Sequence, residues 1–207
     1  MLGCTFEAVG TTDGVTLNSL QGEFVDADEL QVASLNDQGI TEFTSYYYFT
    51  EDGGMVDADG WYNGDFESIG DTVRIPVGSA FWFIAENAKG VTVAGQVHLG
   101  EYTHTITDKK SMVCSAFPVA FNPNVNCTWD GFVDADEIQV AKVNEQGITE
   151  FTSCYYFTED GGMVDEDGWY NGDFEKITEP IAAAGQGFWL MLEDPSGHVF
   201  KETSPVK

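Results

Sequence analysis

The sequence predicts an all-β protein of two tandem homologous domains, each a β-sandwich or small barrel. The first observation is a repeat: residues 24–67 return as residues 132–175, and 38 of the 44 aligned positions are identical. The second is that β-branched and aromatic residues alternate in short runs between Gly, Asn and Asp, while helical periodicity is almost absent. A repeat of this kind indicates one structural module used twice.

The strands of the first copy follow from its apolar runs. Residues 40–49, ITEFTSYYYF, are rich in Thr and aromatic residues, which favour a sheet. The preceding residues 36–39, NDQG, are typical of a hairpin turn because Gly39 accepts a positive φ. Residues 79–84 form a continuous apolar run, which indicates a central strand buried on both faces. Strands are expected near residues 2–7, 29–35, 40–49, 72–77, 80–86 and 90–98.

The second copy repeats this pattern, and the segment between the copies has no counterpart. Its strands are expected near residues 112–117, 137–143, 148–157, 187–193 and 197–202, with Cys114 in the place of Cys4. We therefore assign one β-domain to residues 1–100, a connecting strand or linker to 101–110, and a second β-domain to 111–207. Two explanations of 101–110 stay open. It is a plain linker or an extra strand on one domain, or it is a strand that the first copy lacks and a neighbouring chain supplies.

The charge of the chain limits its partners. Its net charge is −27, from 35 acidic and 8 basic residues, so it repels nucleic acid and anionic membrane surfaces. No apolar run approaches the ~20 residues that a membrane helix needs, so we expect no membrane insertion. Four cysteines, few lysines and an acidic, β-rich composition favour a mature extracellular or cell-surface protein.

An acidic loop at residues 51–65, repeated at 159–173, is the strongest candidate metal site. Calcium binds six to eight oxygen atoms from carboxylates, amides and the backbone. The loop does not match an EF-hand, because counting from Asp57 the sixth residue is Tyr62 and the twelfth is Ser68. The alternative is that Asp and Gly serve only as turn formers. The candidate calcium ligands are Asp57, Asp59, Asn63, Asp65, Asp165, Asp167, Asn171 and Asp173.

Two aromatic pairs are candidate ligand-binding residues. Trp61 and Tyr62, with Trp169 and Tyr170 in the second copy, are expected in loops, where exposed rings can stack on the sugar rings of surface glycans. The alternative is that each pair covers the hydrophobic core.

Catalytic motifs do not stand out, so we expect a protein that is not an enzyme. The three histidines, His98, His104 and His198, are scattered along the chain. The sequence contains no Ser-His-Asp order, HExxH motif, phosphate loop or dinucleotide-binding glycine motif. A carboxylate pair for glycoside hydrolysis is weak evidence where acidic residues are this abundant.

The cysteines allow three pairings. Cys127 and Cys154 occur only in the second copy, where Ser19 and Tyr46 take their places in the first, so they are the candidate disulfide. Cys4 and Cys114 are expected to be buried thiols, or to link modules or neighbouring chains. The chain has no CxxC spacing, so zinc is not indicated.

The order of short motifs supports an expectation about function. A Cys-x-Phe start, DADE followed by Leu or Ile and QV, then YYF, GWY and FW, resembles tandem β-domain repeats of uncharacterised secreted bacterial surface proteins. The resemblance implies an extracellular β-protein and carries no catalytic residues. We expect a structural subunit that assembles with itself, through head-to-tail β-strand contacts, into a surface filament, fibre or layer, with calcium as a possible stabiliser. The alternative is a carbohydrate- or protein-binding surface module.

Overall fold

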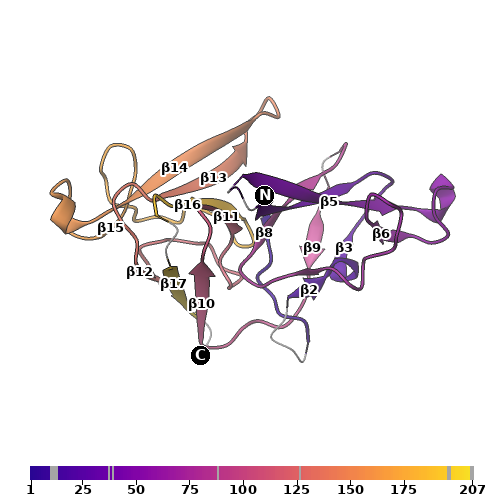
Figure 1. The fold of residues 1–207 in the computed structure, drawn as a ribbon, viewed down its shortest axis with the longest axis horizontal. Coiled ribbons are helices and arrows are strands. Elements are labelled where there is room, and N and C mark those ends of the chain that lie inside the picture. The colour runs from indigo at the N-terminus through magenta and orange to yellow at the C-terminus, as the bar shows by residue number, and fades with distance from the viewer. Residues whose placement is uncertain are drawn as a thin grey trace.

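The computed structural model describes residues 1–9, 14–36, 38, 40–87, 89–125, 127–194 and 197–205. The protein is all-β, as predicted. Among the described residues the helical elements are three short 3₁₀ turns, η1 (Leu17–Ser19), η2 (Glu51–Gly53) and η3 (Glu159–Gly161). Figure 1 shows two lobes on either side of a shared centre, with the N-terminus at that centre.

Each half contains a five-stranded antiparallel sheet with the same strand order. The first sheet runs β1 (Leu2–Gly3), β8 (Ala80–Ile84), β4 (Glu29–Leu35), β5 (Thr41–Phe49) and β6 (Gly60–Tyr62). The second runs β11 (Lys110–Val113), β16 (Phe188–Met191), β13 (Glu137–Val143), β14 (Thr149–Phe157) and β15 (Gly168–Tyr170). The registers match as well, since Glu29 pairs with Tyr47 and Glu137 pairs with Tyr155. The repeated sequence therefore folds into repeated structure.

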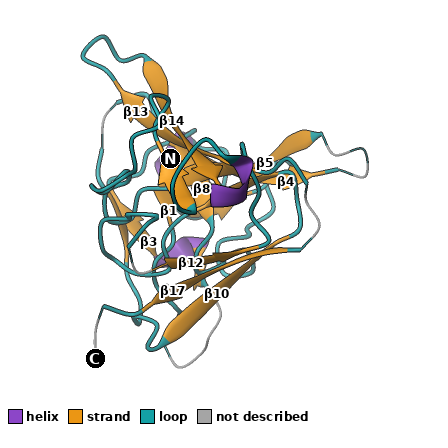
Figure 2. Cartoon of the chain, turned by 90° about the vertical axis from the view of Figure 1, so that its left-hand side faces the viewer, coloured by secondary structure: helices purple, strands orange, loops and turns teal. Residues whose placement is uncertain are grey.

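The long hairpins β4–β5 and β13–β14 extend away from the body of the molecule in different directions (Figure 2). In the second hairpin Gly147 has a φ of 76° and its N–H donates to the carbonyl of Asn144 at 3.0 Å. The Asn144 side chain accepts from the N–H groups of Gln146 and Ile148, each at 3.0 Å. These bonds form, in the second copy, the glycine-containing turn that was predicted for residues 36–39 of the first. In the first copy, Asp37 and Gly39 of that turn lie outside the described residues.

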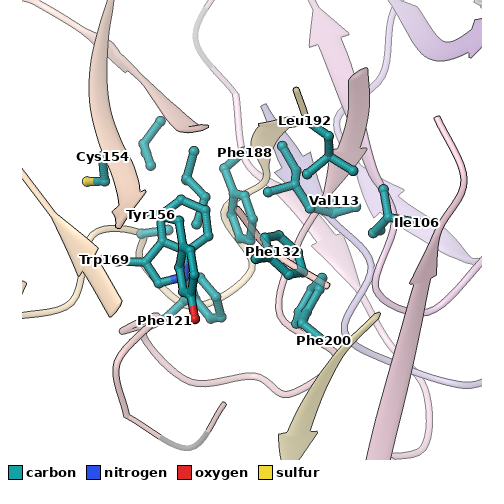
Figure 3. Close-up of a cluster of buried hydrophobic side chains, with 14 residues drawn as sticks. Ile106, Val113, Phe121, Phe132, Cys154, Tyr156, Trp169, Phe188, Leu192 and Phe200 are labelled. Atoms are coloured by element: carbon teal, nitrogen blue, oxygen red, sulfur yellow. The ribbon is translucent and has the colours of Figure 1, made fainter. Parts of the chain in front are cut away.

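The core of each half lies behind its five-stranded sheet. In the second half Trp169, Phe188 and Phe200 lie together with Phe132 and Tyr156 (Figure 3). The apolar strand β16 is buried on both faces, as predicted, since Phe188, Trp189 and Leu190 are all at most 5% exposed. For its counterpart β8 the prediction of burial on both faces is wrong: Phe81 is fully buried, but Trp82 and Phe83 are partly exposed and Ile84 is 46% exposed.

Smaller sheets cover the other side of each core, and here the halves differ. The first half has β2 (Val15–Thr16) with β7 (Arg74–Ile75), and β3 (Leu20–Gly22) with β9 (Val91–Val93). The second half has a three-stranded sheet in the order β10 (Glu101–Ile106), β17 (His198–Thr203) and β12 (Cys127–Asp130). Residues 101–106, which have no counterpart in the repeat, are thus a strand of the second half.

Backbone hydrogen bonds join the two halves at the centre. The N–H of Gly3 donates to the carbonyl of Gly185, and the N–H of Cys114 donates to the carbonyl of Gly78, both at 2.8 Å. A small cluster of Ala80, Met112, Cys114 and Trp189 fills the joint. The structure establishes two similar halves with a shared joint, and it does not separate them into two tandem domains.

The joint corrects the predicted match of Cys4 with Cys114. Leu2 lies opposite Phe81 and Val113 lies opposite Phe188, so Leu2 and Val113 are equivalent and the two cysteines are offset by one residue. Successive residues of a strand face opposite sides. Cys4 accordingly faces the core of the first half, whereas Cys114 lies in the cluster between the halves.

Candidate functional site

The acidic loops are closed by their own carboxylates. Asp26 accepts hydrogen bonds from the N–H and the hydroxyl of Thr50 at 2.6 and 2.8 Å. Asp59 accepts from the N–H of Glu51 at 2.8 Å. Asp134 and Asp167 make the same bonds in the second copy, to Thr158 and to the N–H of Glu159. Asp26 and Asp134 therefore tie the start of η2 and η3 to the turns before β4 and β13. Asp59 and Asp167 tie η2 and η3 to the residues just before β6 and β15.

The predicted calcium ligands are divided between internal bonds and solvent. The side-chain oxygen of Asn63 accepts from the N–H groups of Asp65 and Glu67 at 3.0 and 2.9 Å, so both of its lone pairs are used. Asn171 makes the same pair of bonds. The four remaining candidates, Asp57, Asp65, Asp165 and Asp173, are exposed. In the described part of the chain no three His, Cys, Asp or Glu side chains are grouped to hold a metal ion, and calcium binding stays a prediction.

The tryptophans proposed to stack on sugar rings belong to the core instead. Trp61 is 1% exposed and Trp169 is 0% exposed, so neither indole can reach a glycan. The neighbouring tyrosines are buried as well, and their hydroxyls donate to the carbonyls of Ala58 and Glu166 at 2.8 and 2.7 Å. Their positions agree with the alternative prediction, that each pair covers the hydrophobic core. The residues concerned are Trp61, Tyr62, Trp169 and Tyr170.

The exposed rings in these loops are Phe66 and Phe174. They are 46% and 45% exposed, and both have a positive φ, 60° and 59°, which is unusual for a bulky residue. Each packs on a strand residue, Phe66 on Phe49 at 5.3 Å and Phe174 on Phe157 at 5.1 Å between ring centroids. The sequence signal was the repeated turn Asn-Gly-Asp-Phe, in which Phe occupies the position where a glycine is usual.

All four cysteines are free thiols in the structure, so the predicted Cys127–Cys154 disulfide is not formed. Both residues pack on the core of the second half, where hydrophobic contacts account for their burial. Burial raises the pKa of Cys154 to about 11 and also raises that of Cys127. Because the thiolate is the reactive form, a raised pKa lowers the reactive fraction of both side chains near neutral pH.

Strand β10 is held by a buried carboxylate. Glu202 accepts from Ser115 Oγ at 2.6 Å and from the N–H of Ala116 at 2.9 Å, and its Oε1 lies 2.7 Å from His104 Nε2. The His104 ring stacks on Phe200 with 3.9 Å between centroids. The Ser115 hydroxyl donates to the carboxylate and not to the imidazole, so this group differs from a nucleophile–base–acid relay. Its effect is to fasten β10 onto β17.

The side chains of β10 alternate between the core and solvent. His104 and Ile106 are buried, and Tyr102 is half-buried with its hydroxyl donating to the carbonyl of Val77 at 2.8 Å. The intervening residues Glu101, Thr103 and Thr105 are exposed. Strand β10 therefore fills a groove between β17 and the end of the first half.

The equivalent position in the first half is open. Strand β9 is the counterpart of β17, since residues 90–94 align with residues 197–201. It pairs with β3, and its other edge carries no strand in the described part of the chain. Beyond β9, Gln96 pairs with Glu7, so the open stretch is β9 itself. A cleft of about 330 Å³, the β9 cleft, lies beside it, lined by residues including Leu2, Phe6, Val93, Pro118, Ala184 and Gly185.

Two glycines show that the β9 cleft is the empty counterpart of the β10 groove. Gly78 and Gly185 are equivalent in the repeat and have similar φ values, 76° and 71°. A Cβ atom on Gly78 would collide with the His104 ring, whereas a Cβ on Gly185 would meet no atom within 4 Å. The same backbone turn is thus covered by a strand in one half and left open in the other.

His98 gives the chain a pH-dependent contact near the end of this edge. Its Nδ1 lies 2.7 Å from Glu7 Oε1, and its Nε2 lies 3.0 Å from the carbonyl oxygen of Glu101. The hydrogen bond with Glu7 raises the pKa of His98, although burial opposes the shift. A raised folded-state pKa adds stability below the unfolded pKa of about 6.5, and that stability is lost as pH rises through the folded pKa.

We therefore expect the substitution His98→Gln to be most destabilising at low pH. The difference in free energy of unfolding between wild type and variant should be largest near pH ~5.5 and should shrink toward pH ~8.5. Chemical denaturation across this range measures it, and comparing the two proteins cancels the titration of groups that do not interact with residue 98. A difference that does not change with pH contradicts the assignment.

Comparisons with known proteins add no family. No protein-family model matches the chain, and no curated protein or solved structure is significantly similar to it. In the described residues no helix is long and apolar enough to cross a membrane.

Proposed function

We propose that the protein is an extracellular, non-enzymatic structural protein that assembles with itself through β-strand addition into a surface filament, fibre or layer. The observation that supports this most is the open edge of β9, whose counterpart β17 carries β10. An unpaired edge presents free N–H and C=O groups to which another chain can pair. Every open sheet has unpaired edges, but the edge of β9 differs from an ordinary one because the equivalent edge of β17 is paired with β10 in the same molecule.

Residues 101–106 are not available as the donor strand. Residues 101–106 already pair within their own chain, so they are not a free donor to a neighbour. The acceptor in this proposal is β9 with its cleft. Calcium uptake by the outward acidic loops stays part of the proposal as an added stabiliser.

A surface module that binds carbohydrate or protein is the second candidate. It is favoured by the exposed Phe174 ring, which lines a cleft of about 340 Å³ together with Tyr170, Glu166 and Lys176. An exposed aromatic ring beside charged groups is a common arrangement in binding sites. A protein that stays monomeric and binds immobilised glycans through Phe174 would favour this candidate.

Sedimentation velocity over a wide concentration range, with and without calcium, tests assembly. We expect wild type to associate and Ala184→Trp to require at least about tenfold higher concentration, a difference of about 1.4 kcal/mol. The reason is that Ala184 is exposed at the β9 cleft, so an indole there occupies the space for a second strand.

The matched control is Ala183→Trp. Ala183 is the neighbouring residue, is also exposed, and does not line the cleft, so this variant should associate like wild type. A wild type that remains monomeric at high concentration in both conditions contradicts the assembly proposal.

A further inference from the structure

We propose that the β9 cleft is a receptor site for one extended segment of a second polypeptide that carries apolar side chains at alternate positions. The inference deepens the proposed function and rests on it, because it states what the open edge accepts. The filled β10 groove supplies the geometry of the bound segment, and the lining of the β9 cleft supplies its chemistry.

The bound segment runs antiparallel to β9. In the filled groove His104 lies opposite Phe200 and Ile106 lies opposite His198, and both side chains point inward. The counterparts of Phe200 and His198 are Val93 and Val91. Segment residues opposite Val93 and Val91 therefore point into the cleft, and the residue between them faces solvent, since strand side chains alternate.

The side chain of the bound segment that lies opposite Val93 should be apolar, unlike His104 at the equivalent position of the filled groove. In the filled groove the imidazole stacks on Phe200 and bonds to Glu202. At the equivalent positions the first half has Val93 and Gly95, which offer neither a ring nor a carboxylate. A polar ring buried there would lose its hydrogen bond to water without replacement. With Leu2, Phe6 and Pro118 also lining the cleft, an aliphatic or aromatic side chain fits.

The solvent-facing positions also differ. In the filled sheet Lys201 Nζ lies 3.1 Å from Glu101 Oε1. Ala94 replaces Lys201 in the first half, so an acidic residue on the outward side of the bound segment gains no such partner. The net charge of −27 further disfavours an acidic segment. The segment is therefore neutral or basic on its outward side.

A labelled peptide spanning residues 100–107 of this chain is the probe, in its native form and with His104→Leu. Fluorescence anisotropy with the full-length protein measures its binding at pH ~8, where an exposed His with a pKa of about 6.5 is neutral. We expect the His104→Leu peptide to bind about tenfold more tightly than the native peptide, as burial of a leucine side chain without an unpaired polar group implies. Binding should be lost with Ala184→Trp protein and kept with Ala183→Trp protein.

Two further peptides test the alternation. His104→Ser with Ile106→Ser leaves no apolar side chain opposite Val93 and Val91 and should abolish binding. Thr103→Ser with Thr105→Ser, made in the His104→Leu peptide, changes the outward positions and should leave the binding of that peptide within about twofold, because outward positions contribute little burial. Equal binding of these two peptides, or undiminished binding to Ala184→Trp protein, overturns the proposal.

The outcomes separate this site from the proposed function. Peptide binding by a protein that stays monomeric supports the receptor site and overturns self-assembly. Assembly that the peptide neither joins nor competes with overturns the receptor site, because the contacts then form at another edge.

Discussion

Replacing Glu202 with alanine is expected to lower the free energy of unfolding by about 3–5 kcal/mol. The carboxylate is 3% exposed and is the hydrogen-bond acceptor for Ser115 Oγ and the N–H of Ala116, with His104 as a third partner. Its removal leaves three buried hydrogen-bond donors without their acceptor, and each such donor carries its own desolvation cost. Chemical denaturation at neutral pH measures the loss.

The control for this change is Glu101→Ala on the same sheet. The Glu101 side chain is 55% exposed and pairs with Lys201 at the surface, so its loss should change stability by about 0.5 kcal/mol or less. Because Ser115 and Glu202 contact each other, a double-mutant cycle with Ser115→Ala should show that their effects are not additive. A loss for Glu202→Ala as small as that of the control would show that β10 does not depend on this carboxylate.

Trp169→Ala and Trp61→Ala are each expected to cost about 3–5 kcal/mol. The Trp169 indole packs against Trp129, Phe132 and Tyr156, with ring centroids 4.9 to 6.0 Å away. Trp61 packs in the same way against Phe24 and Tyr48. Removing either indole leaves a large cavity in a closely packed core. Thermal and chemical unfolding of the two variants measure the cost.

Phe174→Ala serves as the control, because this ring lies in the turn that follows β15 and is 45% exposed. It should cost markedly less than Trp169→Ala. The hydrogen bonds between Gly3 and Gly185, and between Cys114 and Gly78, couple the halves, so we expect each tryptophan variant to unfold in a single transition. A small loss on Trp169→Ala would contradict the placement of this indole in the core.

The strands of the repeated blocks were predictable because their signals are local. The observed bounds of β4 and β13 agree with the prediction, and β5 and β14 differ from it by one residue at the start. Each of these strands carries its own β-favouring side chains, and the turn between them is set by adjacent residues. Strands β1 and β9 are shorter than predicted, because each extends only as far as its pairing with β8 or β3.

Side-chain roles at the candidate sites were harder to predict, because they depend on facing direction and on distant partners. Trp61 and Trp169 were expected in loops, but β6 and β15 turn them toward the core. Asp59 and Asn63 have the composition of metal ligands, yet backbone N–H groups of the same loop use their oxygen atoms. Neither fact can be obtained from composition, because each requires the path of the loop.

The sequence by itself determined that one module occurs twice, that it is built of strands, and that residues 101–110 have no counterpart. Only the tertiary structure decided that residues 101–106 pair with β17, and that no strand among the described residues covers the equivalent edge of β9. The pairing joins Glu101 to Thr203 across about half the chain. Glu202 and Phe200 stabilise this pairing, because both contact the His104 side chain of β10. The first half has Gly95 and Val93 at these positions, so the two edges differ although the module is the same.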